Sequence, residues 1–190
     1  GLAIILLEYC IWTALTIIST KTKQNPLSKI LKLWVIGLGI QIIYGAFTAG
    51  LHAGWGYNTY PKMGDNWIPE AAFMFEPFIK NTLYNPVMIQ FIHRHLALIL
   101  GISFFIIWKK INTRTAKQSF TRQLNNLAFI LLILQICLGI LTLIWVIPIK
   151  LALMHQFLAV ILLSTVIVLI HSMSHTYTLN DGKKSKFNYL

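Results

Sequence analysis

The sequence contains little charge, and most of that charge is positive, with 16 Lys and Arg against 5 Asp and Glu. Only 11% of its 190 residues are Asp, Glu, Lys or Arg, whereas an average soluble domain carries roughly 25%. Hydrophobic residues make up 56% of the chain and the mean hydropathy is +0.67, which excludes an ordinary soluble enzyme and a disordered tail. Cysteine is also scarce: Cys10 and Cys137 both lie in apolar runs without a CxxC spacing, which indicates neither a zinc site nor a disulfide framework.

Long apolar runs take the place of the missing charge. A membrane-spanning helix needs about 20 mostly apolar residues, and runs of this length must be helical because lipid offers no partner to the backbone. Five stretches qualify: 1–18, 33–54, 87–108, 127–147 and 151–173. We therefore predict an all-α, multi-pass transmembrane protein with five transmembrane helices, the last four of which form an up-down four-helix bundle.

The remaining first helix suggests a longer parent with another bundle upstream. The chain starts at Gly1 inside an apolar run, with no basic region or cleavage pattern typical of a signal peptide. We predict that residues 1–32 are the last helix of a missing half and a basic inner loop, and that 33–173 are a bundle with a long outer loop at 55–86. Residues 174–190 are predicted to be a polar inner tail that frays, and no internal sequence repeat is obvious.

The basic residues lie on alternate connections between the predicted helices. Twelve of the sixteen Lys and Arg residues fall in the segments 19–32, 109–126 and 174–190, whereas the loop 55–86 carries acidic residues as well. This alternation follows the positive-inside rule. The net charge of +11 is therefore interpreted as a topology signal, and we expect contact with membrane lipid and not with nucleic acid.

Histidines inside the predicted spans are the best candidates for function, because ionisable side chains are costly within a membrane. At a rise of 1.5 Å per residue, His93 and His155 lie roughly 6–9 Å below the outer helix ends, and His52 lies near the outer end of its helix. Imidazoles that project inward at one depth from facing helices could hold a haem iron. Interhelical hydrogen bonding explains His93 and His155 equally well at this point, and it is the preferred interpretation of His52.

The other polar residues of the spans each allow more than one interpretation. Arg94 could pair with a haem propionate or extend to the lipid headgroups. Glu8 needs a partner or a proton at its depth. His95 is expected on another helix face from His93.

His171 and His175 have a metal-compatible spacing, but an interfacial role is favoured. Gly50 and Gly54 favour close helix packing, although small residues could also leave room for a macrocycle. Gln41, Gln90, Gln135 and Gln156 are predicted to form interhelical hydrogen bonds.

Several motifs in order along the chain resemble the haem A synthase family. The resemblance covers about residues 2–173 and rests on the segments Gly45–Gly54 (GAFTAGLHAG), Tyr57–Gly64 (YNTYPKMG), Trp67–Glu70 (WIPE), Gln90–Arg94 (QFIHR), Gln135–Ile140 (QICLGI) and His155–Gln156. It is similar to the form found in mitochondria and related bacteria, which implies a multi-pass protein of the bacterial inner membrane or, alternatively, of the mitochondrial inner membrane.

The resemblance implies eight transmembrane helices in two pseudo-symmetric halves, of which this chain is the C-terminal portion. It implies an oxidoreductase that converts the C8 methyl group of haem O to the formyl group of haem A for cytochrome c oxidase biogenesis. His93 and His155 would be the two axial ligands of a haem b iron. Expected partners are haem O, membrane lipid, an electron donor, and haem O synthase or oxidase assembly proteins.

Two positions depart from the family pattern. His52 and Ile92 stand where acidic residues are commonly found, and both changes remove negative charge near the expected haem. The resemblance implies that another histidine pair and an acidic residue near the substrate haem lie in the missing half, and no catalytic residue is assigned in this chain. The chain alone is therefore expected to bind haem b without converting haem O. The alternatives are a membrane b-type cytochrome that only relays electrons and a transporter or assembly factor without haem.

Overall fold

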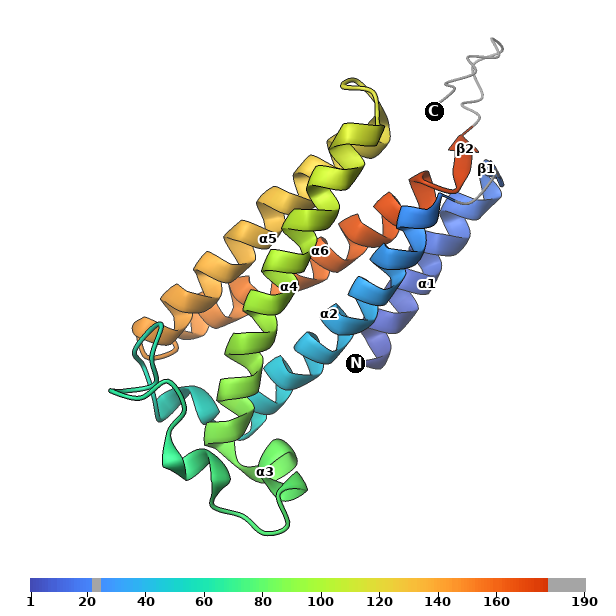
Figure 1. Cartoon of the computed structure of the whole chain (residues 1–190). Coiled ribbons are helices and arrows are strands. Elements are labelled where there is room, and N and C mark those ends of the chain that lie inside the picture. The colour runs from blue at the N-terminus through green and yellow to red at the C-terminus, as the bar shows by residue number, and fades with distance from the viewer. Residues whose placement is uncertain (22–24, 178–190) are drawn as a thin grey trace. The chain divides into compact units, whose positions relative to one another are not determined.

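The computed structural model describes residues 1–21 and 25–177, which fold mainly into helices (Figure 1). The long helices are α1 (Leu2–Ile17), α2 (Pro26–Gly50), α4 (Pro86–Arg114), α5 (Phe120–Ile144) and α6 (Ile149–Ser172). Short 3-10 helices at Ala53–Trp55 and Glu70–Phe73, together with α3 (Ile79–Tyr84), lie in the connection between α2 and α4. Strands β1 (Ser19–Lys21) and β2 (His175–Tyr177) form an antiparallel pair. The prediction of an all-α fold is confirmed.

Four of these helices, α2, α4, α5 and α6, are long and apolar enough to cross a membrane. Helix α1 is apolar but has only 16 residues. The chain is therefore a multi-pass membrane protein, and the count of five spans stays a prediction. The predicted polar tail begins in β2, and its residues 178–190 lie outside the described part of the chain.

The outer ends of two helices come earlier than predicted because of left-handed backbone conformations. Helix α2 ends at Gly50, four residues early, and His52 follows it with a φ of 52°. Helix α5 ends at Ile144, and the next residues include Val146 and Ile147 with φ values of 58° and 57°. A positive φ cannot continue a right-handed helix and is rare for β-branched residues, so hydropathy alone could not reveal these ends.

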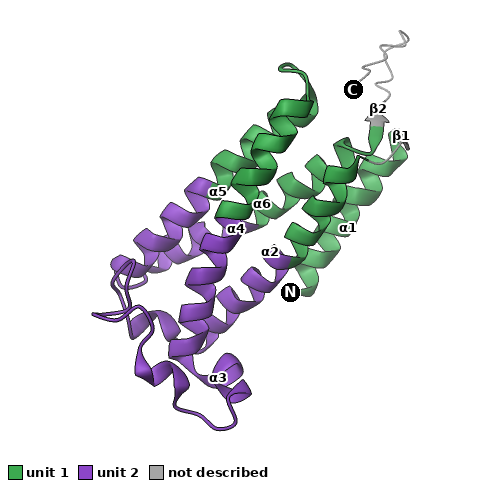
Figure 2. Ribbon diagram, viewed as in Figure 1, with its two compact units in different colours: residues 1–36, 102–132, 160–190 green, residues 37–101, 133–159 purple. Residues whose placement is uncertain are grey.

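The described chain divides into two compact units (Figure 2). Unit 1 comprises Gly1–Ile36, Ile102–Leu132 and Val160–Leu190, and unit 2 comprises Gly37–Gly101 and Ile133–Ala159. Unit 1 contains the connections at 18–25 and 115–119, and unit 2 contains those at 51–85 and 145–148.

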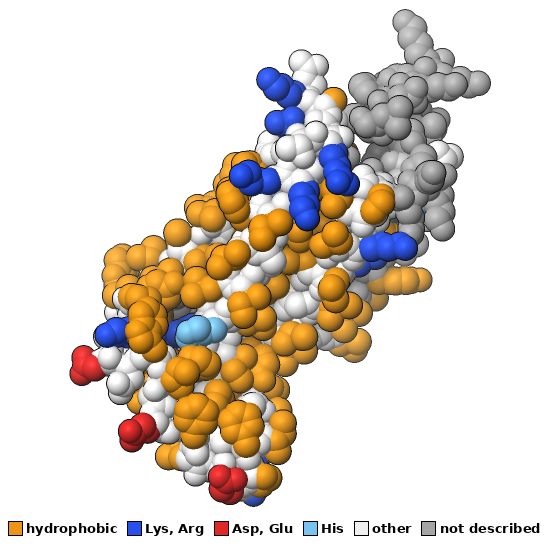
Figure 3. All heavy atoms as spheres, viewed as in Figure 1, with side chains coloured by type: hydrophobic (Ala, Val, Ile, Leu, Met, Phe, Trp, Pro, Cys, Tyr) orange, Lys and Arg blue, Asp and Glu red, His pale blue; other side chains and the backbone are white. Residues whose placement is uncertain are grey.

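Charge separates between these two sets of connections as the predicted topology requires. Blue basic side chains surround the connection between α4 and α5 in unit 1, and red acidic side chains lie on the long connection of unit 2 (Figure 3). The acids of that connection are Asp65, Glu70 and Glu76. Consecutive connections thus belong in turn to unit 1 and to unit 2, and the long connection of unit 2 is the one that carries acidic residues, as the positive-inside rule predicts for an up-down order.

The packing of unit 1 is typical of a protein surrounded by lipid. None of the residues of α1 is buried, and the buried residues of α5 include Thr121 and Asn125. Asn125 donates hydrogen bonds to the Trp108 carbonyl and to the Asn112 side chain, at 3.1 and 3.0 Å. Polar groups thus pair between helices while large apolar side chains remain exposed, the arrangement expected where lipid solvates the outer surface.

Candidate functional site

His93 of α4 is held by a glutamine and a glycine of α2. The Gln41 amide nitrogen lies 3.1 Å from Nδ1 of His93 and donates to the His93 backbone carbonyl at 3.0 Å. A Cβ placed on Gly45, one turn further along α2, would lie 3.1 Å from Cε1 of the imidazole. The ring of His93 therefore packs directly against the backbone of α2. A side chain in place of Gly45 would reduce the space available to the ring.

His155 of α6 has the same surroundings on α5. The Gln135 amide nitrogen lies 3.3 Å from Nε2 of His155 and donates to the His155 backbone carbonyl at 3.0 Å. A Cβ on Gly139 would lie 2.8 Å from Cε1 of this ring. We call His93 and His155 the histidine pair, and Gln41 and Gln135 the glutamine pair.

The shared surroundings reveal an internal repeat, so the expectation of none is wrong. The pattern Q-I-x-x-G-x-x-T occurs at 41–48 and again at 135–142, and H-x-x-L-A-x-I-L occurs at 93–100 and at 155–162. The hydroxyls of Thr48 and Thr142 also make equivalent bonds, each to the carbonyl four residues earlier, at 2.8 and 2.7 Å. The long connection separates the two halves of the first copy, and this hides the repeat in the sequence.

Both histidines and both glutamines belong to unit 2. Three buried polar atoms here have no hydrogen-bond partner: Oε1 of Gln41, Oε1 of Gln135 and Nδ1 of His155. Such atoms are costly, so the surroundings of the histidine pair hold unused hydrogen-bonding capacity.

The donor set fits an axially ligated haem. No group of three or more His, Cys, Asp or Glu side chains that could enclose a bare metal ion occurs among the residues that the structure describes. A haem needs only axial ligands from the protein, because the porphyrin supplies the other four, and imidazole is a common axial ligand. Helices of a bundle commonly supply such ligands from facing positions.

Arg94, the neighbour of His93, holds the long connection of unit 2. Its side chain is buried, and its terminal nitrogens donate to the backbone carbonyls of Tyr57, Thr59 (2.7 Å) and Lys62 (3.3 Å). The side chain is thus directed at this loop, and Nε is buried without a partner. A bond from Arg94 to a haem propionate stays a prediction.

Replacing Arg94 with leucine is expected to loosen the loop around Lys62. Hydrogen bonds from a charged donor contribute about 1.5–3 kcal/mol each, and three carbonyls lose theirs at once. Limited trypsin digestion should therefore cleave after Lys62 at least tenfold faster than in the unmodified chain. Arg94→Lys should give an intermediate rate, because an ammonium group lacks the planar fork of donors.

Cleavage after Lys80 serves as an internal control, because this residue lies in α3 and the loop carbonyls that Arg94 binds belong to Tyr57, Thr59 and Lys62. An unchanged rate after Lys62 in Arg94→Leu would contradict the assignment. So would an equal rise at both lysines, because that result indicates general unfolding.

Four other residues that the sequence singled out lie outside the arrangement around the histidine pair. His52 is exposed and follows the end of α2, so its placement within that helix is wrong. His95 turns its Nδ1 to the Phe91 carbonyl at 2.8 Å. Gly50 has open space around it, and a Cβ on Gly54 would meet Ile147, so these two glycines do not form the predicted helix contact.

The four glutamines differ in their hydrogen-bond partners. The glutamine pair bonds between helices, as predicted. Gln90 instead donates to the Tyr57 carbonyl of the loop at 3.0 Å, and Gln156 is exposed. Treating all four as equivalent missed the two that contact the histidines, and the repeated spacing to a glycine was the signal that distinguishes them.

Unit 1 holds the remaining ionisable groups. Ser164 of α6 donates to Glu8 Oε1 at 2.7 Å, and Glu8 Oε2 is buried without a partner. This supplies the partner that the depth of Glu8 required. His171 is fully buried and stacks on His175 with ring centroids 3.8 Å apart, and Trp12 packs edge-on against His171. Because His171 is buried, it does not lie on an exposed, charged face of α6.

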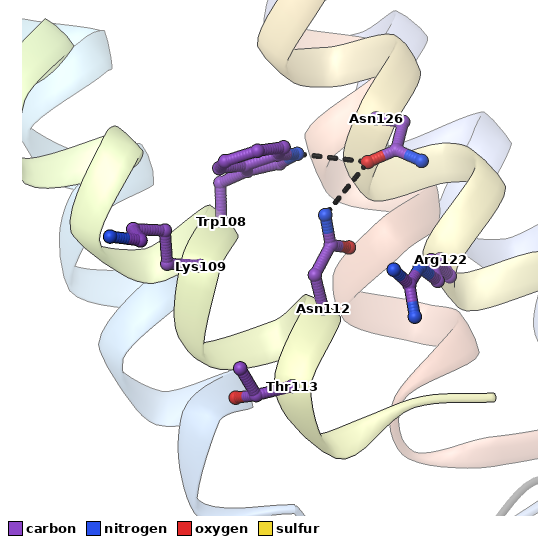
Figure 4. Close-up of a pocket in the computed structure, with 6 residues that line it drawn as sticks. All are labelled: Trp108, Lys109, Asn112, Thr113, Arg122 and Asn126. Carbon is purple, nitrogen blue, oxygen red and sulfur yellow. Dashed lines mark hydrogen bonds between the residues drawn. The ribbon is translucent and has the colours of Figure 1, made fainter. Parts of the chain in front are cut away.

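A surface hollow of unit 1 lies apart in sequence from the histidine pair. It has a volume of about 390 Å³, and Figure 4 shows Trp108 and Asn112 both donating to Asn126 Oδ1 at 2.9 Å. Its lining includes Lys109 and Arg122 but no histidine. The hollow is therefore not the candidate haem site.

Comparison with known proteins gives one consistent result. The family model COX15-CtaA, described as "Cytochrome oxidase assembly protein", matches residues 1–167. The chain is 33% identical to heme A synthase COX15 of Bos taurus over 91% of its length, and 36% identical to heme A synthase of Flavobacterium johnsoniae over 90%. It is 42% identical to heme A synthase of Rickettsia canadensis over 67% of its length.

The chain spans half or less of most of these relatives. The matches cover 43% of the bovine protein, 52% of the Flavobacterium protein and 37% of the Rickettsia protein. No solved structure matches the chain. The comparisons therefore identify relatives of the chain, and the arrangement of its side chains comes from the geometry above.

Proposed function

Since the chain belongs to the COX15-CtaA family of cytochrome oxidase assembly proteins, we propose that it is the C-terminal portion of a haem A synthase. The intact enzyme oxidises the C8 methyl group of haem O to a formyl group during cytochrome c oxidase biogenesis. This portion holds a haem b between His93 and His155. Its family is one of oxidoreductase-type enzymes of inner membranes.

The observation that carries the proposal is the repeated setting of the histidine pair. Two imidazoles on α4 and α6 lie in one unit, each against a glycine backbone and beside a glutamine amide. Two copies of one arrangement supply two equivalent ligands, which is what bis-imidazole ligation of a single iron needs. Haem b ligated in this way supplies a low-spin centre that exchanges one electron.

The residues of this chain have separable tasks in the proposal. The histidine pair binds the iron, and the glycines give the rings room next to the neighbouring helices. Arg94 fixes the loop of unit 2 through its carbonyls, and the apolar helix surfaces exclude water from the site. Haem O as substrate, an electron donor, and haem O synthase or oxidase assembly proteins as partners are part of the proposal.

The test separates methyl oxidation from electron relay. The full-length parent protein is expressed with haem O in cells that lack haem A synthase, and the extracted porphyrins are separated by chromatography. Haem A is the expected product. Extraction of only haem O and haem b, with the haem b spectrum intact, favours the b-type cytochrome. A colourless protein overturns both hypotheses and favours a transporter or assembly factor.

A further inference from the structure

We propose that Gln41 and Gln135 are positioning residues for the iron-ligating imidazoles. When haem b binds, the side-chain oxygen of each glutamine accepts the N–H of the ring nitrogen beside it, which is Nδ1 in His93 and Nε2 in His155, and the other ring nitrogen binds the iron. This inference rests on the proposed function, because it concerns the histidine pair as axial ligands. It adds two residues that act on the haem only through its ligands.

The first argument is an unused acceptor in each copy of the repeat. The amide nitrogens of the glutamine pair donate to the histidine backbone carbonyls, both at 3.0 Å. Only the amide nitrogen can donate to a carbonyl, so the oxygen assignment of both side chains follows from this bond. Both Oε1 atoms are then left buried with no partner, although the amide group of each lies beside an imidazole.

The second argument is the need of a ligating imidazole for an acceptor. A neutral imidazole that gives one nitrogen to iron carries its proton on the other nitrogen. Metal-ligating histidines almost always donate this N–H to a carboxylate, a carbonyl or water, which fixes the ring orientation. The proton stays on the imidazole throughout, and only its hydrogen-bond partner changes.

The third argument is a contrast with two other histidines of the chain. His95 and His175 place Nδ1 at the carbonyl four residues earlier, at 2.8 and 3.1 Å. The histidine pair does not: Nδ1 of His93 faces the Gln41 amide, Nε2 of His155 faces the Gln135 amide, and Nδ1 of His155 has no partner. In the histidine pair, a glutamine amide group therefore takes the place of the backbone acceptor.

Turning the amide group exchanges donor for acceptor without moving the helix. The terminal torsion of glutamine is broad and roughly two-fold, so Oε1 can replace the amide nitrogen beside the ring. The released backbone carbonyl keeps its helical partner. The structure thus holds the ligands in place before haem binds and supplies their acceptor afterwards.

The proposal predicts opposite shifts of the haem reduction potential in two variants. Gln41→Leu removes the acceptor, which makes the imidazole a weaker donor to ferric iron and raises the potential. Gln41→Glu places a carboxylate at Nδ1, which strengthens the ligand and lowers the potential. For a one-electron couple, a tenfold change in the ratio of ferric to ferrous affinity corresponds to about 59 mV, and we expect at least this shift in each direction.

The experiment is a redox titration of the full chain, purified in detergent and loaded with haem b. Gln41 and Gln135 are each replaced with Leu and with Glu, and Gln156→Leu is the matched control because Gln156 is exposed and follows His155 directly. The control should keep the potential of the unmodified chain. Loss of haem from a Leu variant while the Glu variant retains it also supports the proposal.

The outcomes separate this inference from the proposed function. Unchanged potentials with an intact bis-imidazole spectrum overturn the inference alone. Shifts in the same direction for Leu and Glu, or loss of haem from both while the control binds it, indicate a packing role and also overturn it. If the unmodified chain binds no haem, the proposed function fails and the inference fails with it.

Discussion

Replacing His93 and His155 together with alanine is expected to abolish haem absorption of the purified chain. The two rings belong to one unit, and alanine offers iron no ligand at either position. Loss of both axial bonds should lower haem retention by at least 100-fold, measured from absorbance after size-exclusion chromatography. Each single replacement should leave one axial ligand and change the spectrum from low spin to high spin.

The controls for this experiment are the other histidines of unit 2. A His52→Ala, His95→Ala double variant should retain the full spectrum, because His52 is exposed in the loop and His95 bonds within α4. Retention of the low-spin spectrum in the His93→Ala, His155→Ala variant would contradict the proposed ligands. Equal loss in both double variants would show that the assay reports folding instead of ligation.

The positions of the helices could be predicted from sequence because lipid imposes one simple rule. Runs of apolar residues must be helical in a membrane, and the structure has a helix in each predicted run. The ends of α2 and α5 are harder to predict from sequence, because they depend on the local backbone conformation at His52, Val146 and Ile147. Beyond Trp108, α4 continues to Arg114, since lysine and arginine are good helix formers outside the membrane as well.

The candidate site could be predicted only in part. Depth and spacing indicated the histidine pair, because ionisable residues within a membrane are rare. The contacts of Arg94 could not be derived, since they depend on three loop carbonyls whose positions no periodicity describes. The glutamine pair could have been found, because its repeated spacing to Gly45 and Gly139 is present in the sequence.

The charged residues differ in how much of their role can be predicted from sequence alone. The basic residues predicted the sidedness of the connections, a property that depends only on where they lie along the chain. Glu8 gave no such information, because its partner Ser164 is 156 residues away. Long-range pairs of single polar residues leave no local pattern, and the same holds for the contact of Trp12 with His171.

Replacing Gly139 with alanine is expected to be the most damaging single glycine substitution in the long helices of unit 2. The added Cβ would lie 2.8 Å from Cε1 of His155, compared with 3.1 Å from His93 for Gly45→Ala. A carbon atom cannot lie 2.8 Å from Cε1 of His155, so the imidazole ring or helix α5 must shift. Forcing extra volume into a packed site costs about 1–3 kcal/mol, and a displaced ligand costs haem affinity in addition.

The measurement combines haem retention with thermal unfolding in detergent for three single variants. Gly139→Ala should lose haem at least tenfold and unfold at a lower temperature, and Gly45→Ala should show the same effects more weakly. Gly39→Ala is the matched control on α2, because nothing lies within 4 Å of its added Cβ, and alanine favours a helix by about 1 kcal/mol over glycine. The order Gly139, Gly45, Gly39 follows from contact with the imidazoles alone. If Gly139→Ala retained both haem and stability, the ring would not be confined by α5, and the equivalence of the two ligand settings would be lost.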